Sequence, residues 1–173
     1  MSNEERVDIV DESGTVIGET SKAEAHAQGL LHKTVIGQVL NTAGEWLLVR
    51  QSSTRQDVGQ YVCPVGGHVS AGERDDDALV RETQEELGFS PSDFTYSELK
   101  RFVYNRTVLG RIENHLFIVY MIHSDATPRI GDEAESVRFF SDEELRAALR
   151  DTPQLFGAPY RMVVKNCFPQ LLV

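Results

Sequence analysis

The sequence lacks several features that would place it in common functional classes. None of its apolar runs reaches the roughly 18 consecutive residues of a membrane-spanning helix, and its start, MSNEERVDIV, has no basic segment followed by an apolar one. Two cysteines, Cys63 and Cys167, are too few for a disulfide framework and fit a reducing cytoplasm. Neither a P-loop nor a GxGxxG fingerprint occurs. We therefore expect a cytoplasmic protein without a membrane partner.

Positive charge is also scarce. The 173 residues include 17 Lys and Arg against 27 Asp and Glu, which gives a formal net charge of −10. Surfaces that bind nucleic acid are basic, so this balance argues against nucleic acid as a partner. A polyanionic substrate would need help from bound cations to approach such a chain.

Apolar patterning indicates a single α/β domain over residues 1–173 with a mixed sheet covered by helices. Residues 1–32 read as an N-terminal extension, a β-hairpin followed by a helix between the cap Ser21 and Gly29. Further strands are expected in TVIGQVL, EWLLVRQ, TYSELKRFVYNR, ENHLFIVYMIH and SVRFF, and further helices after the capping box Ser141/Glu144 and around APYRMVVKN.

The stretch GHVSAGERDDDALVRETQEELGF, residues 67–89, concentrates carboxylates around few apolar residues. Glu73 and Asp75, Asp76 and Asp77 are expected in the first turn of a helix, where negative charge suits the helix dipole. Helical spacing predicts that Leu79, Thr83 and Leu87 face the core.

Three later glutamates require a different explanation. Glu82, Glu85 and Glu86 fall on the adjoining helix face, within one turn of one another, and repel unless a cation lies among them. Oxygen-rich clusters of this kind suit Mg²⁺ or Mn²⁺. A solvated acidic face is the structural alternative for any one of them.

The spacing of this stretch resembles the Nudix box, a loop–helix–loop of 23 residues. At about 6–7% usage per residue type, a chance match anywhere in the chain is on the order of one in a million. The resemblance implies an α/β/α sandwich that hydrolyses a nucleoside diphosphate linked to another group, with a divalent metal. The matching fixed positions are Gly67, Glu73, Arg81, Glu82, Glu85, Glu86 and Gly88, with Phe89 at the final apolar position.

The resemblance also implies residue roles. Glu82, Glu85 and Glu86 would hold Mg²⁺ or Mn²⁺, assisted by the Gly67 carbonyl or by Glu73, and Arg81 would orient the glutamates. Such an ion neutralises charge on the phosphates and activates the attacking water. The general base would be Glu133, on a later acidic loop, or else Glu85 or Glu86; a solvated loop is the alternative for Glu133. Candidate contacts to substrate phosphate are Arg50, Arg55, Arg101 and Arg106, although surface ion pairs would also explain them.

Outside the box, much of the chain resembles type 1 isopentenyl diphosphate isomerase, a Nudix-fold enzyme. The similar segments are VDIVDESGTVIGE, AHAQGLLHKTVIGQVLNTAGEWLLVRQ, GGHVSAGE, RIEN and DTPQLFGAPYRMVV. In that enzyme histidines and a glutamate bind a metal. The resemblance therefore implies a possible second metal site at His26, His32, His68 and Glu113, although a structural role is the alternative for each histidine.

Two departures separate the chain from that isomerase. Gly66 stands in the place of its catalytic cysteine, and Cys63 lies three residues too early to substitute. His115 replaces its second catalytic glutamate. Both groups that exchange protons with the alkene carbon are therefore missing. We predict an isomerase-like Nudix hydrolase acting on a small diphosphate; isomerisation and a silent binding protein are the alternatives. Homodimers are common in this family, and the sequence leaves oligomeric state open.

Overall fold

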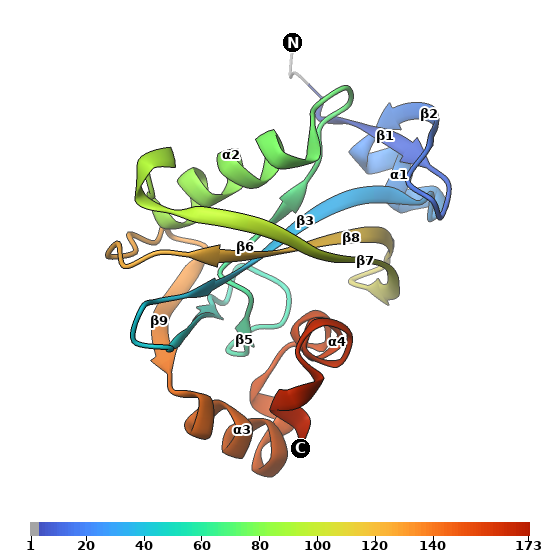
Figure 1. Ribbon diagram of the computed structural model, residues 1–173. Helices are drawn as coiled ribbons and strands as arrows, with labels where there is room; N and C mark the ends of the chain where they lie inside the picture. Colours follow the sequence, from blue (N-terminus) through green and yellow to red (C-terminus); the bar gives the residue numbers. More distant parts are fainter. Residues whose placement is uncertain (1–3) are drawn as a thin grey trace.

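The structure, a computed structural model, describes residues 4–173. Within this range nine strands form one mixed sheet, flanked by four α-helices (Figure 1). The strands are β1 (Arg6–Val10), β2 (Val16–Ser21), β3 (His32–Leu40), β4 (Trp46–Gln51), β5 (Tyr61–Val62), β6 (Val65–His68), β7 (Thr95–Val108), β8 (Arg111–His123) and β9 (Ala134–Phe140). The helices are α1 (Lys22–Gln28), α2 (Asp75–Leu87), α3 (Asp142–Asp151) and α4 (Ala158–Cys167), with short 3₁₀ turns at Pro91–Asp93, Pro153–Leu155 and Pro169–Leu172.

Strand β3 lies at the centre of the sheet because it pairs on both sides. It runs parallel to β8, in register from His32 opposite His115 to Leu40 opposite His123. On its other side it is antiparallel to β6 and, at its end, to β4. The nearly continuous apolar run of β8 suits a place beside β3 in the interior of the sheet, since such a strand is buried on both faces.

Helices cover both faces of the sheet, which confirms the predicted α/β/α sandwich. Figure 1 shows α2 on one side of the sheet and α3 and α4 on the other. Because neighbouring residues of a strand face opposite sides, Val35 and Ile118 pack in the core beneath α2, whereas Ile36 and Phe117 pack with α3 and α4.

The predicted helix caps are present. The Ser21 hydroxyl accepts a hydrogen bond from the Glu24 amide, and Gly29 ends α1 with φ of 65°, a conformation that costs glycine little. Ser141 and Glu144 form the expected capping box at α3. Among residues 4–173, no helix has the length and apolar character needed to cross a bilayer.

Helix α2 follows its predicted pattern with one correction. Leu79, Thr83 and Leu87 are fully buried, as expected, and Gly88 ends the helix with φ of 68°. Glu73 does not belong to the first turn, because the helix begins at Asp75. Its carboxylate instead accepts a hydrogen bond from the Ser70 amide in the preceding loop.

Candidate active site

One large cavity of about 790 Å³ opens where α1, the segment around β5 and β6, α2 and the start of β8 meet. Its lining combines side chains of both charges with apolar ones. The acidic group includes Glu82, Glu85, Glu86, Glu113 and Glu133; the basic group includes Lys22, Arg55, Arg81, Arg106 and Arg111; the apolar group includes Ile36, Cys63, Phe117 and Tyr160.

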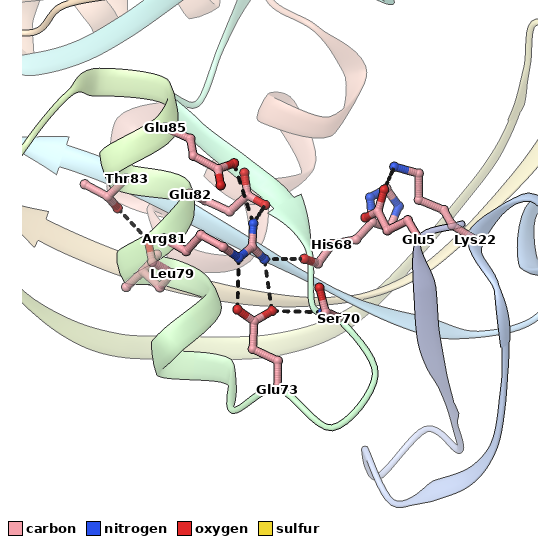
Figure 2. A network of polar contacts seen from close by, with 10 residues as sticks. All are labelled: Glu5, Lys22, His68, Ser70, Glu73, Leu79, Arg81, Glu82, Thr83 and Glu85. Carbon is pink, nitrogen blue, oxygen red and sulfur yellow. Dashed lines mark hydrogen bonds and ion pairs between the residues drawn. The ribbon is translucent and has the colours of Figure 1, made fainter. Parts of the chain in front are cut away.

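Arg81 organises the acidic end of this cavity (Figure 2). Its Nε and one terminal nitrogen each donate to Glu73 at 2.9 Å, and the same terminal nitrogen donates to the His68 carbonyl at 3.0 Å. The other terminal nitrogen lies 2.5 Å from Glu82 and 3.6 Å from Glu85. Charge-assisted bonds of this kind fix orientation, so one guanidinium links the glycine loop to two glutamates of α2.

Gly67 allows β6 and α2 to approach closely. A Cβ atom placed on Gly67 would lie 2.0 Å from the Glu82 carboxyl carbon, a distance that no side chain tolerates. The neighbouring Gly66 has room, since its nearest contact would be the Ile36 side chain at 3.5 Å. The Glu82 carboxylate therefore occupies space that only glycine leaves free at position 67.

Two of the three glutamates lie in surroundings that disfavour their charge. Burial raises the pKa of Glu82, although Arg81 opposes the shift. Burial also raises the pKa of Glu86 to about 7, against the attraction of Arg55 and with further repulsion from Glu133. Glu85 is more open, with 60% of its side chain exposed. A cation among these carboxylates would relieve their repulsion, and their oxygens suit Mg²⁺ or Mn²⁺.

The remaining sequence candidates divide into those at the cavity and those elsewhere. Glu133 lines it and forms an ion pair with Arg55 at 3.1 Å. Arg106 also lines it and is tied to Asp57 at 2.9 Å. Two arginines lie outside the cavity: Arg50, paired with Glu135, and Arg101, paired with Glu98 and Asp75.

Four histidines gather beside the glutamate group. Within the described chain, His26, His32, His68 and His115 are the set of at least three metal-ligating side chains whose ligand atoms all lie within 4.8 Å of one another. Adjacent strands supply three of them: β3, β6 and β8 place His32 opposite His115 and His68 opposite Thr34. The fourth, His26, comes from α1.

Burial lowers the pKa of each of the four imidazoles, which favours their neutral form. Burial lowers the pKa of His26 to about 4 and that of His115 to about 2. His32 Nδ1 donates to the Leu30 carbonyl at 2.8 Å, which leaves the lone pair on Nε2. The Nε2 atoms of His32 and His68 are buried without a hydrogen-bond partner among the residues that the structure describes.

Glu113 and His115 lie near each other on β8 but differ in their contacts. Both Glu113 oxygens are engaged, one by Arg106 at 2.8 Å and the other by Arg111 at 3.1 Å. His115, two residues along the same strand, completes the histidine group instead. The alternation of β8 puts both residues on one side of the strand, so the sequence carried a signal that His115 belongs with this set.

Similarity to known proteins identifies the family. The NUDIX domain matches residues 30–158, about three quarters of the chain. The protein belongs to the Nudix family. The match includes α2 with its glutamates, while His26 and the rest of α1 precede it.

Individual relatives of this Nudix protein fall into two groups. An uncharacterized Nudix hydrolase of Streptomyces coelicolor is 40% identical over 90 residues, which cover 51% of this chain and 50% of that protein. A second, from Nostoc sp., is 39% identical over 89 residues, covering 50% of this chain and 53% of that protein, so the match spans about half the length of each. An isopentenyl-diphosphate Delta-isomerase of Paenarthrobacter aurescens is 32% identical over 177 aligned positions, covering 99% of this chain and 93% of that protein.

Solved structures share the fold of this Nudix protein. The crystal structure of DR0079 from Deinococcus radiodurans matches with a TM-score of 0.73 and 24% identity, covering 95% of this chain and 99% of that one. The NUDIX domain of Shewanella oneidensis NrtR, determined with ADP ribose, matches with a TM-score of 0.58 and 17% identity, over 88% of this chain and 99% of that one. At these identities the likeness concerns architecture.

Proposed function

We propose that this Nudix protein is a divalent-metal-dependent hydrolase that cleaves a phosphoanhydride bond in a nucleoside diphosphate linked to another group, or in a related small diphosphate. The supporting observation is that Glu82, Glu85 and Glu86, all from α2, line one cavity together with Arg55 and Arg106. A cavity with carboxylates for a cation and guanidinium groups for phosphate suits a diphosphate bound through both. The free cysteines, Cys63 and Cys167, fit a cytoplasmic setting.

The metal-binding role falls to the α2 glutamates. Glu82, Glu85 and Glu86 would hold Mg²⁺ or Mn²⁺, with the Gly67 carbonyl or Glu73 assisting. When bound, such an ion neutralises charge on the phosphate oxygens and lowers the pKa of water. Glu73 accepts bonds from Arg81 and from the Ser70 amide, which favours a supporting role. Arg81 is a positioning residue that keeps Glu82 in place.

Proton transfer and phosphate binding are assigned to other residues that line the cavity. Glu133 is our choice for the base that accepts a proton from the attacking water, with Glu85 or Glu86 as substitutes. Its pairing with Arg55 at 3.1 Å has a consequence for substrate binding. A phosphate that attracts Arg55 would release Glu133 as the pair separates, which couples binding to the availability of the base.

A second candidate is isopentenyl diphosphate isomerisation, favoured by the similarity to isomerases over nearly the whole chain. The cavity provides weak support for the required proton transfers. Gly66 offers no acid or base, and burial raises the pKa of the Cys63 thiol above its usual value. A thiol that stays protonated is a poor base at neutral pH, so hydrolysis remains our first choice.

A substrate panel separates these functions. The protein is incubated with Mg²⁺ and, in turn, nucleoside diphosphates, nucleotide sugars, dinucleoside polyphosphates and isopentenyl diphosphate. We expect release of phosphate, pyrophosphate or a nucleoside monophosphate from at least one of them. Dimethylallyl diphosphate formed without phosphate release would instead establish isomerisation. Ligand binding without any turnover across the panel would contradict both enzymatic readings.

A further inference from the structure

Arg106, which the proposed function assigns to phosphate, is already occupied by the protein's own side chains. Its two terminal nitrogens donate to the two oxygens of Asp57, at 2.9 and 3.0 Å, and one of them also donates to Gln56 at 2.9 Å. Its Nε donates to Glu113 at 2.8 Å. Each nitrogen of this guanidinium therefore has an acceptor before any substrate arrives.

Asp57 holds Arg106 in the way that a phosphate would. Carboxylates and phosphates both accept two parallel hydrogen bonds from a guanidinium, and Asp57 lines the cavity together with Arg106. We propose that Asp57 occupies a phosphate subsite of this cavity, so that a diphosphate must displace its carboxylate from Arg106 to bind there. This inference rests on the proposed function, because it concerns how the same cavity holds its substrate.

The charges around Arg106 favour an anion once Asp57 leaves. Glu113 pairs with both Arg106 and Arg111, so these three side chains carry one net positive charge, which Asp57 cancels. Only 17% of the Arg106 side chain and 14% of the Asp57 side chain are exposed, and an uncompensated charge at such a place is costly. A terminal phosphate, with a charge of about −1.5 to −2 at neutral pH, would replace the carboxylate with a stronger attraction.

The segment that carries Asp57 has features that suit its release. Asp57 has φ of 55°, in the left-handed region, which is uncommon outside glycine although aspartate is among the residues that adopt it. Such conformations persist where contacts favour them, and the bonds from Arg106 are contacts of this kind. The next residue, Val58, has 59% of its surface exposed, so this turn has little apolar burial to lose when it moves.

Competition from Asp57 would lower the affinity of the cavity for every anion. A ligand binds this subsite only in the fraction of molecules in which Arg106 is free, and its apparent affinity falls by that fraction. Removing the charge of Asp57 should therefore tighten the binding of a diphosphate. A carboxylate that only fastened the turn would give the opposite result, because its loss would disorder the cavity.

Binding of methylenediphosphonate, a diphosphate analogue whose bridge water does not cleave, tests the proposal. Calorimetric titration in Mg²⁺ compares the wild type with Asp57→Asn, which keeps the shape of the side chain and removes its charge. A subsite that is free in about a tenth of the molecules or fewer predicts at least about 10-fold tighter binding by the variant. Glu98→Gln is the matched control, because Glu98 holds Arg101 with both oxygens outside the cavity, and it should bind like the wild type.

A double substitution shows whether the gain depends on Arg106. In an Arg106→Gln background, Asp57→Asn should no longer tighten binding. A gain that persists there, or an equal gain in Glu98→Gln, would trace the effect to the overall loss of negative charge and overturn the proposal. Unchanged or weaker binding by Asp57→Asn would overturn it as well.

Amide hydrogen exchange in the wild type decides the question if Asp57→Asn does not fold. The Gln60 amide donates to the Asp57 carbonyl at 2.9 Å, so displacement of Asp57 by saturating analogue should speed exchange at Gln60. Slower or unchanged exchange there would refute displacement.

The subsite and the proposed hydrolysis can fail separately. Tighter binding by Asp57→Asn in a protein that cleaves no compound of the substrate panel would contradict hydrolysis alone. Turnover of a panel substrate, with equal analogue affinity in the wild type and Asp57→Asn, would contradict the subsite alone.

Discussion

Glu86 is the residue whose charge is most clearly disfavoured by its surroundings in the cavity. Burial raises its pKa to about 7, Arg55 opposes the shift, and Glu133 adds to it. An acid with a folded pKa above its unfolded value of 4.5 keeps a proton that the unfolded chain has already released. Its contribution to stability is therefore complete below pH 4.5 and is lost as the pH rises through about 7.

This shift predicts a pH-dependent difference between the wild type and Glu86→Gln. Glutamine cannot ionise, so the free energy of unfolding of the variant, relative to the wild type, should increase as the pH rises from 4.5 to about 7 and then level off. Denaturant unfolding in EDTA at several pH values measures this difference. A difference independent of pH would show that Glu86 titrates normally.

Arg81 shows a second property of single residues in this site. It contacts Glu73, the His68 carbonyl and Glu82, which come from the glycine loop and from α2. The resemblance to the Nudix box implied that Arg81 orients the glutamates, and this role stays a prediction. The spacing of the sequence could not show that the Arg81 guanidinium contacts both the glycine loop and α2. These contacts exist only because the loop folds back onto the helix.

Among the secondary-structure elements, β6 and α2 lie closest together at Gly67 and Glu82, where the proposed metal-binding glutamates begin. Gly67 lies against the Glu82 carboxylate on the α2 side of the strand, whereas His68 joins the histidines. Two adjacent residues thus border the glutamate group and the histidine group. Such placement needs alternation along a strand and the absence of a side chain at position 67.

Gly67→Ala should therefore reduce hydrolysis by roughly 10- to 100-fold, because the new Cβ must displace Glu82 and catalytic groups tolerate little misplacement. Gly66→Ala is the paired control, since its Cβ would meet only ordinary contacts. Steady-state turnover with Mg²⁺ and the substrate found in the panel compares the two variants. Equal activity of both would mean that the position of Glu82 is unimportant.

Sequence patterning predicted most elements because their signals are local. Ser21 and Gly29 bound α1, the Ser141 capping box starts α3, and the α2 stripe faces the core. The prediction that Glu73 lies in the first turn of α2 was wrong. The acidic run does not indicate that the helix begins only at Asp75.

On the scale of the whole molecule, the site is assembled from segments far apart in the chain. Contacts such as His32 opposite His115 depend on the parallel register of β3 and β8, which local pattern does not encode. For the same reason, sequence alone could not separate Arg55 and Arg106, which reach the cavity, from Arg50 and Arg101, which do not. The pairing of strands far apart in the sequence decides which charged side chains reach the cavity.

Net charge links the site to the rest of the molecule. A chain with a formal charge of −10 repels a diphosphate over most of its surface. Six glutamates line its cavity and add to that negative field, alongside Arg55, Arg106 and other cations. Binding of a polyanion should therefore depend on the ion that the α2 glutamates are proposed to hold, and chelation should abolish turnover.

Turnover of Glu86→Gln and Glu85→Gln tests the proposed hydrolysis most directly. Either substitution removes a carboxylate from the metal-binding set and should lower the rate at saturating Mg²⁺ by at least about 100-fold. Asp77→Asn, an exposed substitution on the same helix, should retain wild-type turnover. Wild-type rates in both glutamine variants would contradict hydrolysis through a metal held by α2.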